Sequence, residues 1–180
     1  MEQLIETERL IIRHLMPTDE KGMFLMDTNA AVHKYLGNHP LKTLEEVRKV
    51  IQFVRQQYTD LGIGRWAVLE KETNEFVGWT GFKYMQDMVN KHVDHYDFGY
   101  RLRQEFWGKG YATESALAAL KYGITTLRLK DIYAMTDIDN LASRHVLEKI
   151  GFTLVEIFKY DAEPTWREPD APTTWYEYKQ

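Results

Sequence analysis

The sequence contains no cysteine. This absence excludes disulfide bridges, cysteine-ligated zinc and a thiolate nucleophile, so a group transfer has to proceed without a cysteine-bound intermediate. It also favours a reducing compartment, and we therefore expect a cytoplasmic protein. The N-terminus has no basic signal region and no apolar run approaches the length of a bilayer crossing, so we expect no membrane association.

An excess of positive charge is also missing. Lys and Arg total 23 against 27 acidic residues, which gives a net charge of −4 at pH 7. This balance provides no basic field for nucleic acid and mildly favours cationic partners such as amines. The chain has 180 residues, of which 44% are hydrophobic, and we expect one domain spanning residues 1–180.

Hydrophobic periodicity predicts a mixed α/β chain. The expected strands are 7–13, 66–69, 76–83, 96–102, 131–136, 152–158 and 174–178. The expected helices begin near residue 18, at 30–36, at 44–61, at 112–127 and at 143–149. This order predicts a central mixed, mostly antiparallel sheet of six to seven strands with helices on both faces.

The stretch 97–115 reads as a strand, a short loop and the start of a helix. Gly108, Gly110 and Ala112 leave its backbone bare, and the first helical turn offers unpaired N–H groups. These donors and the helix dipole favour an anion such as a phosphate, although an ordinary helix start is the alternative. Lys109 adds a positive charge, but the backbone amides around it suffice for this role.

Three motifs together resemble those of the Gcn5-related N-acetyltransferases (GNAT). Trp107-Gly-Lys-Gly-Tyr-Ala112 resembles the acetyl-CoA loop of that family, with Trp107 where the wider family usually has Gln or Arg. This departure is common in the ribosomal-protein N-terminal acetyltransferase branch, which also typically opens with a motif such as Thr7-Glu-Arg-Leu10. The third motif is Asn140-x-x-Ser143, followed by Lys149-Ile-Gly-Phe152 at a helix end.

The resemblance implies the GNAT fold and an acetyl-CoA-dependent N-acetyltransferase that needs no metal. The acceptor it implies is a primary amine, either a protein N-terminus or a small amine, which attacks directly in a ternary complex. A homodimer is compatible with the resemblance. The alternative from another class is a non-catalytic module that binds or senses acyl-CoA.

The resemblance also implies where acetyl-CoA binds. The backbone of Tyr100, Arg101 and Leu102 is expected to pair with the pantetheine arm, and one of their N–H groups to polarise the thioester carbonyl. An ordinary strand ladder is the alternative, although Gly99 suggests a bulge or the close approach of another group. The pyrophosphate is expected at Trp107, Gly108, Lys109, Gly110, Tyr111, Ala112 and Thr113.

The catalytic candidates are Ser143 and Asp97. The resemblance implies that Asn140 contacts coenzyme A and that Ser143 lies near its sulfur, where the hydroxyl protonates or hydrogen-bonds the departing thiolate. A helix cap for Asn140 and a solvated or back-bonded serine are the alternatives. Asp97 is the first candidate for the base, sharing a strand face with Gly99 and Arg101; a solvated carboxylate is its alternative.

His92, Asp94, His95 and Asp97 superficially resemble a metal cluster. No matching ligand group occurs elsewhere in the sequence, and we expect no metal. We instead consider that these acids, together with the acidic residues of the expected loop 159–173, attract a cationic amine. The alternative is a charged loop that is simply solvated. The sequence leaves open whether this loop is a substrate lid.

Overall fold

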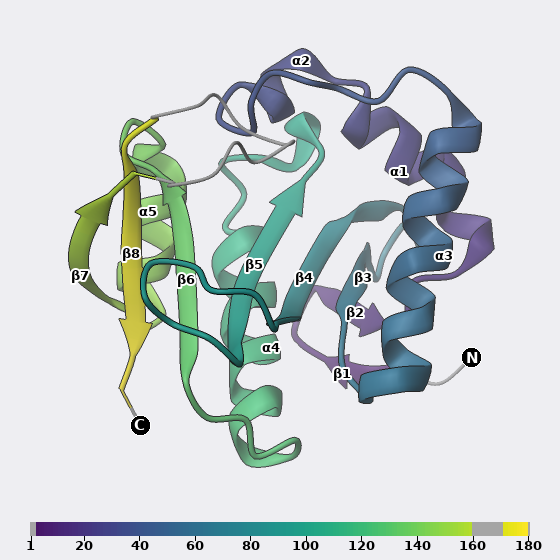
Figure 1. Ribbon diagram of the computed structural model, residues 1–180. Helices are drawn as coiled ribbons and strands as arrows, with labels where there is room; N and C mark the ends of the chain where they lie inside the picture. The colour runs from purple at the N-terminus through teal and green to yellow at the C-terminus, as the bar shows by residue number, and fades with distance from the viewer. Residues whose placement is uncertain (1–2, 160–170, 180) are drawn as a thin grey trace.

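The structure is a computed structural model, which describes residues 3–159 and 171–179. Its centre is an eight-stranded sheet in the order β1-β2-β3-β4-β5-β6-β8-β7 (Figure 1). Every neighbouring pair is antiparallel except β5 and β6. The strands are β1 Gln3–Glu6, β2 Leu10–Arg13, β3 Arg65–Glu70, β4 Phe76–Met85, β5 His95–Leu102, β6 Ile132–Asp137, β7 Thr153–Phe158 and β8 Thr173–Tyr178. The predicted mixed, mostly antiparallel sheet is confirmed, with more strands than the six to seven expected.

The additional strand arises at the N-terminus, where a single strand over 7–13 was expected. The chain instead forms a hairpin of β1 and β2, because Thr7 turns it back. The Thr7 N–H donates to the Leu10 carbonyl at 3.0 Å, and the Leu10 N–H donates to Thr7 Oγ1 at 3.0 Å. The β-branched residues on both sides of the turn favour a strand locally, so the alternation of side chains does not reveal this turn.

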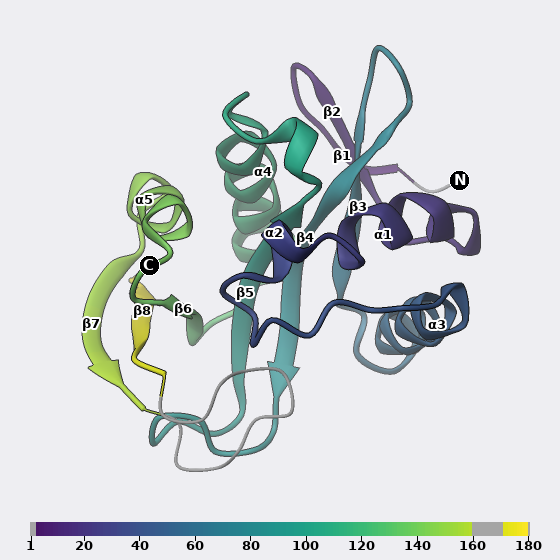
Figure 2. The ribbon, with the colours of Figure 1, turned by 90° about the horizontal axis from the view of Figure 1, so that it is seen from above.

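Helices cover both faces of the sheet, as expected (Figure 2). One face carries α1 Glu20–Asp27, α2 Ala30–His33 and α3 Leu44–Leu61; the other carries α4 Tyr111–Thr125 and α5 Leu141–Lys149. The second helix ends at His33 rather than at residue 36. No helix within residues 3–159 or 171–179 is both long and apolar enough to cross a membrane.

Two hydrophobic cores lie on opposite faces of the sheet. One packs α4 onto the sheet through residues such as Phe98 and Leu120. The other packs α1 and α3 onto it through residues such as Ile51 and Leu69. The predicted capping box begins α3. Thr43 Oγ1 accepts a hydrogen bond from the N–H of Glu46, and the Glu46 carboxylate accepts one from the N–H of Thr43. The two cores thus hold helices against both faces of the central strands.

The sheet opens between its two parallel strands. β5 and β6 pair only through Tyr96 with Ile132 and Asp97 with Tyr133. Beyond these positions β5 stays paired with β4 as far as Leu102, whereas β6 stays paired with β8. The C-terminal half of β5 therefore has one edge without a strand partner. The expected loop 159–173 and its acidic residues lie outside the described residues, apart from the ends of the loop.

Candidate functional site

A cavity of about 1000 Å³ lies at this opening in the sheet. Its walls come from both faces, with α4 and α5 on one side and residues of α1, β3 and β4 on the other. All predicted site residues except Lys109 line it. They are Asp97, Tyr100, Arg101, Leu102, Trp107, Gly108, Gly110, Tyr111, Ala112, Thr113, Asn140 and Ser143. Predicted residues from three separate segments of the sequence thus meet around one space.

The loop before α4 presents a row of backbone donors to the cavity. Gly108 and Gly110 have φ values of 74° and 82°, a region that glycine adopts at little cost. Within the described chain, none of the N–H groups of residues 108–113 donates to a protein acceptor. The unpaired donors and the positive end of the α4 dipole point to an anion site here.

The side chains of Trp107 and Lys109 have different roles in this loop. Trp107 Nε1 donates to the Leu102 carbonyl at 2.9 Å and ties the loop to the end of β5. Lys109 is exposed and is not among the residues that line the cavity, and its Nζ lies 4.9 Å from the centroid of the Phe106 ring. The backbone of Lys109, rather than its side chain, belongs to the site.

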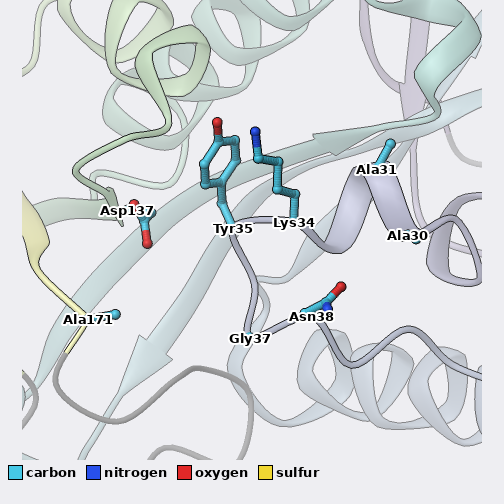
Figure 3. A pocket seen from close by; sticks show the side chains of 8 residues that line it. All are labelled: Ala30, Ala31, Lys34, Tyr35, Gly37, Asn38, Asp137 and Ala171. Atoms are coloured by element: carbon cyan, nitrogen blue, oxygen red, sulfur yellow. The ribbon is translucent and has the colours of Figure 1, made fainter.

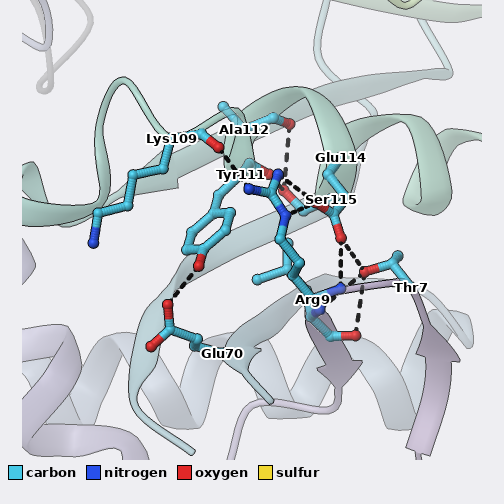
Figure 4. A network of polar contacts seen from close by, with 9 residues as sticks. Thr7, Arg9, Glu70, Lys109, Tyr111, Ala112, Glu114 and Ser115 are labelled. Carbon is cyan, nitrogen blue, oxygen red and sulfur yellow. Dashed lines mark hydrogen bonds and ion pairs between the residues drawn. The ribbon is translucent and has the colours of Figure 1, made fainter. Parts of the chain in front are cut away.

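Arg9 connects the N-terminal hairpin to this loop (Figure 4). Its Nη1 donates to the Lys109 carbonyl at 2.9 Å, its Nε donates to Glu114 Oε2 at 2.7 Å, and its guanidinium lies 4.6 Å from the Tyr111 ring centroid. Thr7 Oγ1 donates to the other Glu114 oxygen at 2.7 Å. The motif at residues 7–10 was visible in the sequence, but nothing there indicated that it holds the loop.

The open edge of β5 presents alternate backbone groups to the cavity. Tyr96 donates its N–H toward β6 and Arg103 donates its N–H toward β4. Since backbone groups alternate sides along an unbroken strand, the N–H groups of Tyr100 and Leu102 point to the open edge. The N–H of Arg101 points to β4, so Arg101 lines the cavity with its side chain.

The bulge suggested at Gly99 does not form. The ladder between β4 and β5 runs without a shift, and Gly99 pairs with Gly81. The close approach occurs at Gly81, where an added Cβ would lie 2.4 Å from the Gly64 carbonyl oxygen. A Cβ at Gly99 would only make an ordinary contact with Trp79 at 3.5 Å. The glycine pair leaves this part of the sheet bare of side chains.

Two hydroxyl groups meet beside the opening, one on β5 and one on α5. Tyr100 Oη donates to the Ser143 carbonyl at 2.7 Å and lies 3.3 Å from Ser143 Oγ. Burial raises the pKa of Tyr100, so its hydroxyl keeps its proton at neutral pH. Asn140 Oδ1 accepts the Ser143 N–H at 3.2 Å, which is a helix cap. The sequence interpretation missed the Tyr100 side chain.

Asp97 lines the cavity from the opposite face of the sheet. Its Oδ2 lies 3.4 Å from Arg65 Nη2, and Lys83 stands directly across from it on β4. Burial raises the pKa of Asp97, although the charges of Arg65 and Lys83 act in the opposite direction. A carboxyl group with a raised pKa in a cavity is a better proton acceptor than one with an ordinary pKa. Neither cation was among the predicted site residues.

The two histidines near Asp97 pack together in an aromatic cluster, with ring centroids 6.3 Å apart, and Asp94 has a different partner. His92 stacks on Trp175 with ring centroids 5.2 Å apart, and His95 is buried. Asp94 instead accepts a hydrogen bond from a tyrosine hydroxyl at 3.1 Å. Within residues 3–159 and 171–179, no group of three or more potential ligands is placed to hold a metal ion.

A smaller cavity of about 360 Å³ adjoins the main one (Figure 3). It lies between residues 30–38 and Asp137 at the end of β6. Lys34 and Tyr35 line both cavities, and the Lys34 Nζ is 4.9 Å from the Tyr35 ring centroid. The main cavity therefore has an extension on the side of α2, away from the α4 loop.

Comparison with known proteins matches most of the chain to one family. Residues 9–153 match a family model described as an acetyltransferase (GNAT) domain. The uncharacterized N-acetyltransferase YoaA of Bacillus subtilis is 31% identical over 149 residues, which cover 83% of this chain and 82% of YoaA. The spermidine N(1)-acetyltransferase of Escherichia coli is 25% identical over 143 residues, which cover 79% of this chain and 72% of that protein.

Solved structures share the architecture over almost the whole chain. A GNAT-family acetyltransferase from Bacillus anthracis has a TM-score of 0.77 and 26% identity, and the match covers 96% of each chain. RimL, a ribosomal L7/L12 α-N-protein acetyltransferase solved with coenzyme A, has a TM-score of 0.81 and 20% identity, covering 98% of this chain and 97% of RimL. At that identity, the likeness to RimL shows the fold alone.

Proposed function

This chain belongs to the GNAT acetyltransferase family, and on that premise we propose that it transfers an acetyl group from acetyl-CoA directly to a primary amine in a ternary complex. The observation that carries the proposal is the cavity through the sheet. The N–H donors of the loop before α4 line this cavity on one side, and the Asp97 carboxyl lines it from the other face of the sheet. The acceptor class, a protein N-terminus or a small amine, is part of the proposal.

The described residues fit acetyl-CoA, the acyl donor of this family. The N–H groups of residues 108–113 are placed to receive a pyrophosphate. The N–H groups of Tyr100 and Leu102 are placed to pair with an extended pantetheine arm as an added strand would. Asn140 lines the same space and keeps its proposed contact to coenzyme A in addition to its role as a cap.

The residues of the chain have separate tasks in the transfer. The Tyr100 N–H donates to the thioester carbonyl oxygen and stabilises the negative charge that develops there. Asp97 accepts the proton that the amine loses as the new C–N bond forms. The C–S bond breaks, and the departing sulfur takes its electron pair beside the Ser143 hydroxyl, which hydrogen-bonds it. Holding both reactants at the opening supplies much of the rate.

Ser143→Ala is expected to slow acetyl transfer without weakening coenzyme A binding. The variant loses the hydroxyl beside the sulfur but keeps the N–H that Asn140 caps. Because a thiolate leaves readily, we expect kcat to fall by about 10- to 100-fold, the lower end of acid–base effects. Stopped-flow thiol release and calorimetry of coenzyme A binding measure the two quantities. An unchanged kcat would remove Ser143 from the chemistry; Tyr100→Phe tests the neighbouring hydroxyl in the same assay.

Arg9→Ala is expected to weaken coenzyme A binding by about tenfold, because the loop loses charge-assisted hydrogen bonds at Lys109 and Glu114. Arg9 positions the loop and does not line the cavity, so kcat at saturating acetyl-CoA should stay near that of the wild type. Arg48→Ala is the matched control, since Arg48 pairs with Glu20 at 2.7 Å outside the cavity. Equal affinities in both variants would contradict the positioning role.

Turnover itself is tested by measuring free thiol release from acetyl-CoA across a panel of amines and N-terminal peptides. Tight coenzyme A binding without turnover above that in solvent would favour the non-catalytic binding module instead. A single domain over residues 1–180 and a cytoplasmic location stay predictions from the sequence, which leaves the oligomeric state open, with a homodimer as one option.

A further inference from the structure

The acceptor side of the cavity carries more positive than negative side chains. Within the described residues, four cations and two carboxylates line the cavity. None of them comes from the loop before α4 or from α5. They are Lys34, Arg65, Lys83, Arg101, Asp27 and Asp97. This balance is opposite to the net charge of −4, from which cationic partners were expected. The local charge of the cavity, rather than the charge of the whole chain, acts on a bound substrate.

One pair of these charges is matched within the protein. Arg101 Nη1 donates to Asp27 Oδ1 at 2.8 Å, and Asp27 is buried. Although burial opposes its ionisation, nearby His33, whose Nε2 lies 3.8 Å from Asp27 Oδ1, and the charge and hydrogen bond of Arg101 keep the pKa of Asp27 below its usual value. Asp27 and Arg101 therefore form a compensated ion pair, which leaves little charge for a ligand.

Within the described chain, Arg65 and Lys83 are only partly matched. Asp97 is the cavity carboxylate between Arg65 and Lys83, and its contact with Arg65 is 3.4 Å long. Arg65 Nε is buried without a hydrogen-bond partner, and Lys83 forms no hydrogen bond or ion pair within the described chain. Asp87 also attracts Lys83, but it is exposed and outside the cavity. Among residues 3–159 and 171–179, one cavity carboxylate thus faces two cations.

The charge of these cations is under-compensated. Burial lowers the pKa of Arg65, and repulsion from Arg101 lowers it further against the attraction of Asp97. Burial also lowers the pKa of Lys83, and repulsion from Arg65 adds to this effect. A bound anion would relieve both costs, whereas a second ammonium group on the substrate would increase them.

The geometry leaves room for such an anion. The Arg65 guanidinium lies 4.4 Å from the Trp79 ring centroid, and stacking of this kind holds a guanidinium in a fixed orientation. Its side chain is 31% exposed. Gly99 lines the cavity beside the Trp79 ring, which lies 3.5 Å from the position of an added Cβ. A planar fork held at the cavity wall suits a carboxylate or a phosphate.

We propose that the acceptor amine also carries an anionic group, a carboxylate or a phosphate, which Arg65 and Lys83 bind while the amino group faces Asp97. This inference rests on the proposed acetyl transfer and names the substrate class of the same site. The anion brings the charges of Arg65, Lys83 and Asp97 to balance. It also anchors the acceptor beside the base, on the face of β5 opposite the Ser143 hydroxyl.

The test compares acceptors that differ only in the anion. Purified enzyme and acetyl-CoA are assayed with α-amino acids, their carboxamides and their decarboxylated amines. Phosphoethanolamine against ethanolamine separates phosphate from carboxylate, and spermidine represents polyamines. We expect kcat/KM to be about 10- to 100-fold higher for the anionic member of a pair, the strength of hydrogen bonds between charged groups. Equal or faster acetylation of the neutral amines or spermidine would overturn the inference.

Two variants assign the preference to the proposed residues. Arg65→Gln is expected to reduce kcat/KM for the anionic acceptor to that of its neutral partner and to leave the Kd of coenzyme A unchanged. Arg48→Gln makes the same charge change outside the cavity and should keep the preference. Lys83→Gln serves as a second test should Arg65→Gln not fold.

The possible results distinguish a failure of this inference from a failure of the proposed acetyl transfer. A preference that survives in both Arg65→Gln and Lys83→Gln would overturn the assignment while acetyl transfer stands. Coenzyme A binding without turnover of any acceptor would overturn acetyl transfer, and the substrate class with it.

Discussion

Replacing Gly110 with proline is expected to abolish coenzyme A binding. Gly110 has a φ of 82°, whereas the proline ring holds φ near −65° and removes the backbone N–H. The loop would have to leave its present conformation, and one donor of the anion site would be lost. A cost of roughly 3 kcal/mol corresponds to at least about 100-fold in affinity. Isothermal titration with coenzyme A measures the effect.

Gly62→Pro is the matched control for this variant. Gly62 has a φ of 68° at the end of α3 and does not line the cavity. Proline there should lower the melting temperature but leave the coenzyme A affinity close to that of the wild type. Circular dichroism establishes that both variants are folded. Wild-type affinity in a folded Gly110→Pro variant would mean that the phosphate site lies elsewhere.

Asp97→Asn is expected to lower kcat by at least about 100-fold, because it removes the carboxylate that accepts the amine proton. Coenzyme A binding should be unaffected, since Asp97 lies on the opposite face from the α4 loop. The wild-type kcat/KM should rise with pH through the raised pKa of Asp97, as the carboxyl loses its proton. The asparagine variant should lack this limb of the pH profile. Steady-state kinetics between pH 4 and 9 would check both outcomes.

The stability of this variant separates a chemical loss from a structural one. Burial raises the pKa of Asp97 in the folded state above its unfolded value, so the folded state holds this proton more tightly. The contribution of Asp97 to the unfolding free energy therefore falls as the pH rises from the unfolded to the folded pKa. Asparagine removes the burial cost of the carboxylate but also takes a partner from Arg65 and Lys83, so at pH 7 the melting temperature of the variant should stay close to that of the wild type. A low melting temperature together with low activity would contradict this account.

Local features of the chain were predictable from the sequence. The capping box at Thr43, the stop at Gly62 and the glycine loop before α4 depend on neighbouring residues, and their conformations follow from local steric and hydrogen-bonding preferences. The order of strands and helices was predictable for the same reason, apart from the N-terminal hairpin. Its turn at Thr7 has no glycine or proline to mark it.

The charges around the substrate depend on contacts between distant segments. Arg9 and Glu114 are 105 positions apart, and Arg65 and Asp97 are 32 apart, so no local pattern relates them. Sequence reasoning named Asp97, Ser143 and the loop as separate candidates. Their common cavity exists because β5 and β6 diverge after Asp97, which depends on how the two halves of the sheet pack against their helices. The sequence by itself determined the family and the glycine loop before α4. The tertiary structure decided the charge of the cavity, because long-range packing sets which side chains share a buried space.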